Sequence, residues 1–541
     1  MDHPFAITLD VGTSLDNQTG SWRTSKPVYL DRLPPCNHGC PAGENIQGWL
    51  FHAESGQYEA AWRALSEDNP LPAVMGRVCY HPCETACNRA HIDDAVGINS
   101  VERFLGDEAI RRGWRFAPPP RKSGKRVLVV GAGPSGLSTA YHLRRLGHAV
   151  EIREAGPLAG GMMRFGIPKY RLPRDVLDAE IERIRAFGVP ITLNAKVANI
   201  YKAMKNGGFD AAFLAVGAHI AKRAYIPAGE AAKILDAVAL LRSMESEEKP
   251  LLGRRVAIYG GGNTALDVAR TAKRLGATEA IIVYRRTRDR MPAHDFEVEE
   301  ALEEGVMMKW LSTIKRMDEG KITVEKMMLD EKGFPQPTGE LETLEADSLV
   351  LALGQDVDLS LLDGMPGLAI RDGVVQVGAD MMTGAPGIFA GGDMVPAERT
   401  VTVAVGHGKK AARNIDAWLN GRTYAAAGKH ELAEFERLNA WYYADAPKTL
   451  RPTLEMARRR TTFEEVTQGL DETNALYEAR RCLSCGNCFE CDNCYGVCPD
   501  NAVIKLGPGK RFRFDYDFCK GCGVCAQECP CGAIAMVPEA I

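Results

Sequence analysis

The sequence of 541 residues lacks several features that mark particular classes of protein. No apolar run approaches the roughly 18 residues that a membrane-spanning helix needs. The first ten residues, MDHPFAITLD, contain no apolar core of a signal peptide. The formal net charge is -4, so the chain has no basic excess of the kind that nucleic-acid-binding proteins carry. We therefore expect a cytoplasmic protein with no membrane and no nucleic-acid partner.

Cysteine is absent from one long part of the chain, the residues between Cys87 and Cys482. All 16 cysteines fall in two blocks, five from Cys36 to Cys87 and eleven from Cys482 to Cys531. In a cytoplasmic protein such clusters indicate metal ligands rather than disulfides. The middle of the chain also lacks a redox-active cysteine pair.

The middle contains two units in which a buried strand is followed by a glycine-rich turn and a helix. The first, RVLVVGAGPSGLSTAYHLRRLGHAVEIREAG, has Gly131, Gly133 and Gly136 in the turn and Glu154 at the end of the next strand. The glycines allow a tight turn, close approach of a pyrophosphate and close helix–strand packing. The helix N-terminus offers free N–H groups to the phosphates, and Glu154 can accept hydrogen bonds from a ribose. The unit predicts a dinucleotide site.

The second unit is RVAIYGGGNTALDVARTAKRLGATEAIIVYRRTRDRMPA, with Gly260, Gly262 and Ala265 at the corresponding turn positions. Its second strand ends at Arg285 and Arg286, where the first unit has an acid. Cations at this position suit the 2′-phosphate of NADP. We therefore predict a nicotinamide site that favours NADP, with NAD as the alternative.

The C-terminal block contains two copies of one motif, C-x2-C-x2-C-x3-C-P. This spacing resembles that of bacterial two-cluster ferredoxins, in which the fourth cysteine of each copy binds the other cluster. A zinc site would use four cysteines in two pairs and would not explain the doubled spacing. We predict one [4Fe–4S] cluster on Cys488, Cys491, Cys494 and Cys529, and another on Cys519, Cys522, Cys525 and Cys498.

Two further segments, FDAAFLAVGA (209–218) and GIFAGGDMVPAERTVTVAVGHGKKAARNI (387–415), follow in order. With the first glycine turn they resemble the flavoproteins built from two dinucleotide-binding folds. That resemblance implies FAD in the first fold and the nicotinamide dinucleotide in the inserted second fold. It assigns to FAD the residues Gly131, Gly133, Pro134, Ser135, Gly136, Glu154, Gly161, Arg164, Val197, Gly217, Gly392, Asp393, Thr402 and Val403. It assigns to the nicotinamide dinucleotide Gly260, Gly262, Asn263, Thr264, Ala265, Arg285 and Arg286.

The N-terminal cysteine block is less regular, with Cys36-x3-Cys40-Pro followed by GRVCYHPCETAC, which holds Cys79, Cys83 and Cys87. Together with VGINSVERF, GGMMRFGIPKYRLP, GGGNTALD, VYRRTRDRMP and GGDMV, it resembles the small subunit of glutamate synthase and the matching domain of dihydropyrimidine dehydrogenase. The resemblance covers about residues 30–420. It implies two [4Fe–4S] clusters in the N-terminal domain.

One cysteine pair of that family is missing here, because Leu33, Pro34 and Pro35 stand where its C-x2-C would be. RRCLSCG at 480–486 has the missing spacing. We therefore hypothesise that one cluster is bound by Cys40, Cys79, Cys83 and Glu102, and another by Cys36, Cys87, Cys482 and Cys485. The alternative is three clusters in all, with Cys482 and Cys485 as spare thiols. In the same way, Glu102 could be an exposed helix acid instead of a ligand.

These motifs predict a multidomain α/β protein with two Rossmann-like three-layer domains between two iron–sulfur domains. We expect an extended arm at 1–30, a helical [4Fe–4S] domain at 31–116, a discontinuous FAD domain at 119–250 and 375–420, an NAD(P) domain at 251–374, a helical linker at 421–480 and a ferredoxin-like α+β domain with two [4Fe–4S] clusters at 481–541.

We expect an oxidoreductase that moves electrons between NAD(P)(H) and [4Fe–4S] clusters through FAD, since a flavin couples two-electron hydride transfer to one-electron acceptors. No catalytic acid or base is assigned. The tail FDYDFCKGCGVCAQECPCGAIAMVPE resembles the delta subunit of 2-oxoacid:ferredoxin oxidoreductases, and the chain has no thiamine-diphosphate motif. We predict a hetero-oligomer with thiamine-diphosphate-dependent 2-oxoacid oxidoreductase subunits. The alternatives are a free-standing NAD(P)H:ferredoxin oxidoreductase, a glutamate synthase small subunit and a structural iron–sulfur scaffold.

Overall fold

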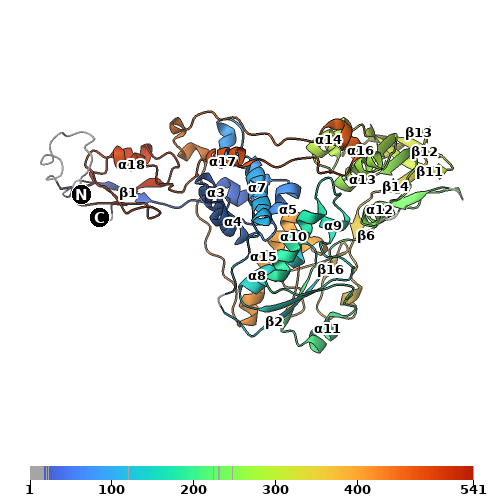
Figure 1. Cartoon of the computed structure of the whole chain (residues 1–541), viewed down its shortest axis with the longest axis horizontal. Coiled ribbons are helices and arrows are strands. Elements are labelled where there is room, and N and C mark those ends of the chain that lie inside the picture. Colours follow the sequence, from blue (N-terminus) through green and yellow to red (C-terminus); the bar gives the residue numbers. More distant parts are fainter. Residues whose placement is uncertain are drawn as a thin grey trace.

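The computed structural model describes residues 18–19, 21, 23–119, 121–222, 224–229, 232–246 and 248–539. These residues form a T in Figure 1. The cross-bar holds a small α+β unit at the chain ends, a helical unit in the middle and one dinucleotide-binding unit, and the stem is the other dinucleotide-binding unit. The first 17 residues of the predicted arm lie outside the described residues.

The stem is built on a parallel five-stranded sheet in the order β18-β5-β2-β3-β4. These strands are β2 (Arg126–Val130), β3 (Ala149–Arg153), β4 (Ile191–Thr192), β5 (Ala211–Leu214) and β18 (Ile388–Ala390). The helices of the stem are α8 (Pro134–Arg145), α9 (Met162–Phe165), α10 (Arg174–Ala186), α11 (Ile200–Gly207) and α15 (Val401–Leu419). Strands β2 and β5 are almost entirely buried because helices cover the sheet, as in other parallel sheets.

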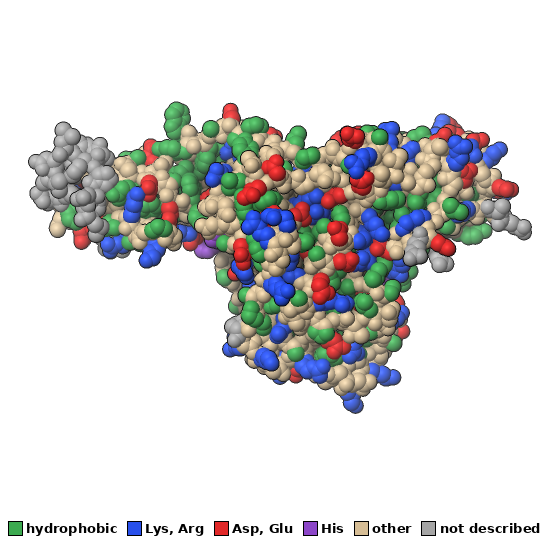
Figure 2. All heavy atoms as spheres, in the orientation of Figure 1, with side chains coloured by type: hydrophobic (Ala, Val, Ile, Leu, Met, Phe, Trp, Pro, Cys, Tyr) green, Lys and Arg blue, Asp and Glu red, His purple; other side chains and the backbone are tan. Residues whose placement is uncertain are grey.

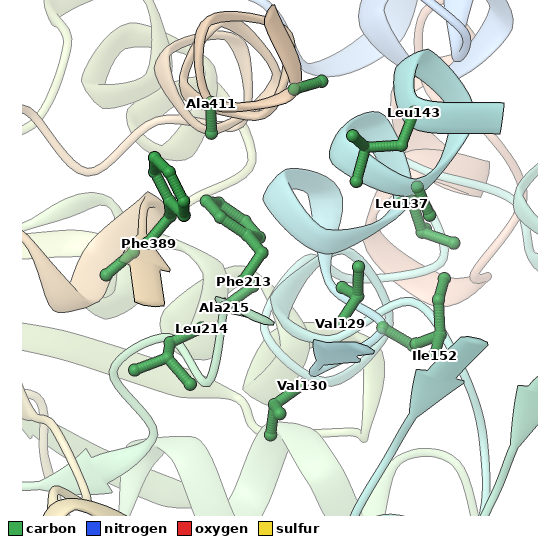
Figure 3. Close-up of a cluster of buried hydrophobic side chains, with 14 of the residues drawn as sticks. Val129, Val130, Leu137, Leu143, Ile152, Phe213, Leu214, Ala215, Phe389 and Ala411 are labelled. Carbon is green, nitrogen blue, oxygen red and sulfur yellow. The ribbon is translucent and has the colours of Figure 1, made fainter. Parts of the chain in front are cut away.

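Helices α8 and α15 pack against each other and against the central strands of this sheet. Figure 3 shows the resulting core, in which Phe213 and Phe389 lie on neighbouring strands near Ala411 of α15. The same view places Leu137 of α8 near Val129 of β2. This packing fixes the N-terminal ends of both helices at the carboxyl edge of the sheet, where ligands of open α/β sheets bind.

The second dinucleotide-binding unit has the strand order β10-β9-β8-β14-β7. Its strands and helices are β7 (Ile234–Asp236), α12 (Ala237–Ser243), β8 (Arg255–Tyr259), α13 (Asn263–Arg274), β9 (Glu279–Val283), α14 (Asp295–Glu303), β10 (Met307–Lys309) and β14 (Ser348–Leu351). Between β10 and β14 an antiparallel sheet is inserted, made of β11 (Ser312–Asp318), β12 (Lys321–Leu329) and β13 (Pro335–Glu345).

Strand β7 differs from the expected domain boundary. The predicted boundary at residue 250 leaves this strand in the FAD domain, but β7 pairs with β14 in the second sheet. Three residues are too few to show a strand period, so the sequence carries no signal for its sheet. The two units are joined by the short pair β6 (Ile220–Ala221) and β15 (Gln355–Asp356), and a hairpin of β16 (Ile370–Arg371) and β17 (Val374–Val375) follows.

The helical unit contains α2 (Pro35–Gly39), α3 (Ile46–Glu54), α4 (Tyr58–Ser66), α5 (Pro72–Val78), α6 (Pro82–Thr85) and α7 (Ile98–Arg111). Helices α5 and α7 cross closely at two glycines. A Cβ on Gly76 would lie 2.4 Å from the Cα atom of Arg103, and one on Gly106 would lie 2.3 Å from the backbone nitrogen of Ala73. The crossing brings Cys79, at the end of α5, close to the buried side of α7.

Residues 421–480 are mostly not helical, which corrects the predicted helical linker. They contain two short α-helices, α16 (Met456–Thr461) and α17 (Glu472–Arg480). The rest runs along the other units, where Ala433 N–H donates to Leu33 O at 2.9 Å and Val466 N–H donates to Tyr170 O at 2.9 Å. Helix formation is interrupted because Pro447 and Pro452 lack an N–H donor and clash with a preceding turn.

The unit at the chain ends takes its first strand from the N-terminal arm. Strand β1 (Ser25–Tyr29) pairs antiparallel with β21 (Ile534–Pro538), and Figure 1 shows β1 at the end of the cross-bar that also holds the red C-terminal elements. The remaining elements are α18 (Asn493–Gly496), β19 (Val503–Lys505), β20 (Phe512–Phe514) and α19 (Val524–Gln527). The ferredoxin-like domain is thus discontinuous, since almost the whole chain lies between its first and second strands.

The face of the molecule seen in Figure 2 is not dominated by charge of one sign. Figure 2 shows basic and acidic side chains interspersed over the visible side of the molecule. Among the residues that the structure describes, no helix is both long enough and apolar enough to cross a membrane.

Candidate functional site

The first glycine-rich turn and the start of helix α13, directly after the second turn, border one cavity of about 660 Å³. Three parts of the chain line it, the two dinucleotide folds and the segment around Cys79. Ten residues predicted to bind FAD line this cavity, namely Gly131, Gly133, Pro134, Ser135, Glu154, Gly161, Val197, Gly217, Gly392 and Asp393. Asn263 and Thr264 of the second turn line it as well.

The first glycine turn is closed toward the sheet and open toward the cavity. Gly131 has a φ of +107°, and a Cβ there would lie 2.3 Å from the carbonyl oxygen of Ala215. A Cβ on Gly136 would lie 2.0 Å from Gly131 O, so helix α8 could not start so near the strand with a larger residue. A Cβ on Gly133 would have its nearest neighbour, the Cα atom of Gly161, 3.9 Å away. This open space leaves the room that a pyrophosphate needs.

Two carboxylates follow the carboxyl ends of two strands of this sheet, β3 and β18. Glu154 comes directly after β3 and accepts hydrogen bonds from the N–H groups of Ala132 and Gly156, both at 2.8 Å. Asp393 follows β18 and lines the same cavity. Burial raises the pKa of the Asp393 carboxyl above its ordinary value, and the charge of Arg399 opposes that shift. A ligand with hydroxyl groups would satisfy both acids.

Helix α15 begins at the cavity wall. Thr400 caps it by accepting a hydrogen bond from Val403 N–H at 3.2 Å, and Thr400 and Val401 line the cavity. The N-terminal N–H groups and the positive end of this helix therefore face the cavity. Thr402 and Val403, both predicted to contact FAD, do not line it. The side chain of Thr402 lies beside Cys79 instead, where it opposes the rise that burial causes in the pKa of that thiol.

Gly136 and Arg164 also lie away from the cavity wall. Arg164 is buried, donates through Nε to Ala159 O at 2.7 Å and forms an ion pair with Asp178. It supports the loop that contains Gly161 rather than contacting the cavity.

The second turn has the same arrangement as the first. Gly260 has a φ of +149°, and a Cβ on it would lie 2.2 Å from Ala352 O. Gly262 precedes helix α13 and has no atom within 4 Å of the position of a Cβ. Arg285 is exposed, and the buried Nε of Arg286 has no hydrogen-bond partner among the described residues. A bound phosphate would supply the acceptor that Nε lacks. Gly260, Gly262, Ala265, Arg285 and Arg286 lie outside the cavity wall.

Tyr80 is a cavity residue that the sequence analysis missed. Its hydroxyl accepts a hydrogen bond from Asn263 Nδ2 at 2.6 Å, and its ring stacks on His294 with centroids 3.6 Å apart. Tyr80 and Val78 line the cavity on either side of Cys79. The sequence feature that could have identified Tyr80 as a site residue is its position directly after Cys79.

The first N-terminal group consists of Cys40, Cys79, Cys83 and Glu102. These side chains lie close enough for their charges to affect one another's pKa. Glu102 is 5% exposed, so it is not the exposed helix acid of the alternative interpretation. It accepts a hydrogen bond from Asn69 Nδ2 at 2.8 Å, and the buried Glu44 accepts another at 3.1 Å. Burial and the charge of Glu44 raise the pKa of Glu102 well above its ordinary value. A cation beside these acids would relieve the shift.

The second group brings the two ends of the cysteine pattern together. Cys36 and Cys87 of the N-terminal block line one small cavity with Cys482 and Cys485 of the C-terminal block. The side chain of Asn88 donates a hydrogen bond to Cys485 Sγ at 3.5 Å. Burial raises the pKa of the Cys36 thiol, and the neighbouring thiols add to the shift. Metal binding deprotonates such thiols.

The ferredoxin-like unit holds two further groups of cysteines. Cys498, Cys519, Cys522 and Cys525 line one small cavity, while Cys488, Cys491, Cys494 and Cys529 lie within electrostatic reach of one another. Within the described residues, no group of three or more His, Cys, Asp or Glu side chains is arranged for a single metal ion. All-cysteine donor sets of this kind suit iron–sulfur clusters.

Family models match three parts of the chain. Residues 125–408 match the pyridine nucleotide-disulphide oxidoreductase model. Residues 31–114 match the model of dihydropyrimidine dehydrogenase domain II with its 4Fe-4S cluster, and residues 512–535 match a 4Fe-4S binding domain.

Three relatives are similar over most of the chain. The NADP(+)-dependent formate dehydrogenase subunit beta of Moorella thermoacetica is 37% identical over 497 residues, covering 83% of this chain and 70% of the relative. The NADPH-Fe(3+) oxidoreductase subunit beta of Geobacter sulfurreducens is 33% identical, covering 84% and 76%. The glutamate synthase [NADPH] small chain of Escherichia coli is 32% identical, covering 71% and 89%.

The fold and the cavity therefore define an NAD(P)H-dependent oxidoreductase with FAD and with [4Fe–4S] domains at both ends of the chain. The chain belongs to the pyridine nucleotide-disulphide oxidoreductase family. The predicted fold class and the resemblance to the glutamate synthase small subunit and dihydropyrimidine dehydrogenase are confirmed. Despite the family name, the two dinucleotide folds contain no cysteine.

The residues at the cavity fit the groups that this family binds. When bound, FAD supplies the chemistry that joins hydride transfer from a nicotinamide to one-electron transfer. Open space beside Gly133 and Gly262 and the N-terminus of α15 are the features that would orient bound dinucleotides. It brings Cys79 to the cavity through the flanking Val78 and Tyr80.

Proposed function

We propose that this chain is the NADP(H)-linked subunit of a larger oxidoreductase and carries electrons between NADP(H) and a partner subunit. The main support is the cavity that the first glycine turn and the start of α13 share with Val78 and Tyr80. These two residues flank Cys79, so a cluster on Cys79 would lie next to the dinucleotide site. Short distances of this kind are what the protein has to provide for electron transfer between bound groups.

We further propose four [4Fe–4S] clusters on the four groups described above, arranged in series. The two N-terminal groups take ligands that are close in the sequence. Cys36 and Cys40 belong to different groups, and so do Cys83 and Cys87. The same holds at Cys485 and Cys488, three residues apart, where the N-terminal groups meet the ferredoxin-like unit. Each step from one group to the next is therefore short. The proposed ligands of the four clusters are those predicted from the sequence, including Glu102.

NADP is the proposed nicotinamide dinucleotide. Arg285 and Arg286 follow β9, at the position where a cation can bind the 2′-phosphate. The unpartnered Nε of Arg286 supports this assignment. All three relatives described above carry NADP or NADPH in their names.

The partner is proposed to be a separate catalytic subunit in the cytoplasm. The resemblance of the C-terminal tail to the delta subunit favours a thiamine-diphosphate-dependent 2-oxoacid oxidoreductase. The names of the two beta-subunit relatives favour formate or Fe(3+) chemistry instead. Purification of the tagged chain from its source under anaerobic conditions separates these candidates. A thiamine-diphosphate subunit in equal amount supports the first, and a formate-oxidising subunit the second.

The electron-transfer function is tested by anaerobic reduction of the purified chain. We expect NADPH to bleach the flavin absorbance and then to produce the electron paramagnetic resonance (EPR) signals of reduced [4Fe–4S] clusters. NADH should reduce the flavin and clusters at least about tenfold less efficiently than NADPH, since the lost phosphate contact weakens binding by about 1.4 kcal/mol or more. Flavin reduction without any cluster signal, under conditions where dithionite produces one, would contradict the proposal.

A further inference from the structure

Strand β1 joins the N-terminal arm to a domain whose other strands lie near the opposite end of the sequence. It pairs with β21 from Ser25 opposite Pro538 to Tyr29 opposite Ile534. Lys26 forms an ion pair with Glu539 at 3.0 Å, which holds the start of the strand. The spacing of the cysteines does not require this strand.

Tyr29 ends this strand and lies against the cysteines of the ferredoxin-like unit. Its ring stacks on Phe514 with centroids 4.8 Å apart and an interplanar angle of 15°. Its hydroxyl lies 3.2 Å from the Sγ atom of Cys494. Tyr29 also packs against the core that contains Cys494, Cys525 and Cys529. The stacking and the strand pairing together fix the direction of the hydroxyl.

The direction of this hydrogen bond follows from the chemistry of the two groups. A cysteine that binds iron does so as a thiolate, which can only accept. A phenol with an ordinary pKa of about 10 keeps its proton at neutral pH and can donate. With the cluster bound, the contact is therefore an O–H···S hydrogen bond to a charged acceptor, which is stronger than one between neutral groups.

We propose that Tyr29 is a positioning residue that raises the reduction potential of the cluster on Cys488, Cys491, Cys494 and Cys529 by donating a hydrogen bond to Cys494 Sγ. The inference rests on the ligand set in the proposed function. Reduction adds negative charge to the cluster, and a donor at a ligand sulfur stabilises that charge. The arm thus supplies a group that tunes the cluster nearest to Cys482 and Cys485.

The test compares Tyr29→Phe with the unaltered full-length chain. The change removes one hydroxyl and keeps the ring that stacks on Phe514. We expect the midpoint potential of this cluster to fall by about 59 mV, which is a tenfold change in a one-electron equilibrium. The measurement is an anaerobic potentiometric titration with mediators and dithionite, followed by EPR, on samples with equal iron and FAD content.

Tyr516→Phe is the matched control. The Tyr516 hydroxyl donates to Pro27 O of the same strand at 2.8 Å and touches no cysteine sulfur in the described contacts. Its loss should leave the potential unchanged. An unchanged potential in Tyr29→Phe overturns the inference, and so does an equal fall in both variants, which would trace the effect to the strand position. Because dithionite replaces NADPH, failure of NADPH to reduce the clusters tests only the proposed function.

Discussion

Single glycines decide where a dinucleotide comes close to the backbone. Gly131 and Gly260 both have positive φ angles, and a side chain on either would collide with the carbonyl oxygen of a neighbouring strand. Gly133 and Gly262 have ordinary φ angles and open surroundings. The first pair is therefore required by the fold, whereas the second pair is required by the ligand.

Gly262→Ala separates ligand binding from folding. The added methyl group meets no protein atom within 4 Å, but it lies where the pyrophosphate of NADP approaches helix α13. We expect NADPH to bind roughly tenfold more weakly, a loss of about 1.4 kcal/mol, with unchanged FAD and iron content. The dissociation constant can be measured by titration of the protein under anaerobic conditions.

Gly428→Ala is the control for this substitution, because its Cβ also has no neighbour within 4 Å and its φ is not positive. It lies in the segment between α15 and α16, outside the cavity wall. NADPH affinity should stay the same in this variant. Equal affinity in the Gly262→Ala variant and the unaltered chain would place the pyrophosphate elsewhere.

At the scale of elements, one buried carboxylate joins three helices. Glu304, at the end of α14, is fully buried and accepts hydrogen bonds from Arg270 and Arg274 of α13, each at 2.7 Å. Arg459 of α16 donates to the same carboxylate at 3.3 Å. Burial alone would raise the pKa of Glu304, but the hydrogen bonds from Arg270 and Arg274 outweigh it and lower the pKa to about 2.

We expect Glu304→Gln to destabilise the second dinucleotide-binding unit by about 3–5 kcal/mol, because it leaves the buried guanidinium of Arg274 without its charge partner and weakens the pairing of Arg270. A lowered pKa in the folded state stabilises the protein above the unfolded value near 4.5. This contribution is lost as the pH falls from about 4.5 toward about 2. The difference between variant and unaltered chain should therefore shrink over that range. Thermal unfolding followed by circular dichroism provides the measurement.

Glu303→Gln is the neighbouring control. Glu303 is 60% exposed and pairs only with Arg459, at 3.1 Å, among the described ion pairs. An exposed pair of this kind contributes about 0–1 kcal/mol. If the two variants unfold at the same temperature, the buried network around Glu304 does not hold the helices together.

At the scale of the whole molecule, the two ends of the chain meet twice. Helix α17 packs against α3 and α7, which brings Cys482 and Cys485 beside Cys36 and Cys87. Arg481 secures this return, since its buried guanidinium pairs with Asp93 at 3.1 Å. Strand β1 makes the second connection, at the ferredoxin-like unit. The proposed electron route therefore depends on contacts between distant parts of the sequence.

The double variant Cys482→Ala/Cys485→Ala tests this closure. We expect about 16 Fe per FAD in the unaltered chain and a loss of about four in the variant, the content of one cluster. NADPH should still bleach the flavin, but the ferredoxin-like clusters should be reduced far more slowly. Iron analysis and stopped-flow absorbance measure the two effects.

Cys531→Ala serves as the control, because Cys531 is the one cysteine without a proposed cluster, although its Sγ lies 3.8 Å from that of Cys529. Its iron content should equal that of the unaltered chain. About 12 Fe in the unaltered chain, with no loss in the Cys482→Ala/Cys485→Ala variant, would leave three clusters and contradict the split ligand set.

The sequence by itself determined the features that depend on short spacings. Both glycine turns, the two ferredoxin motifs and the family could be recognised because a turn or a cluster loop places its requirements within a few consecutive residues. The buried strands of the two sheets were also visible as apolar runs. The short β7 was assigned to the wrong side of a boundary because three residues carry no periodic signal.

Only the tertiary structure decided which distant segments meet. Tyr80 on Asn263, Glu44 beside Glu102 and Tyr29 on Cys494 are contacts between segments that lie far apart in the sequence. The expectation of a helical linker at 421–480 was wrong, since that segment follows the surfaces of other units and takes its hydrogen bonds from them. Such contacts are determined by the burial and hydrogen bonding of whole units, and no local pattern records them.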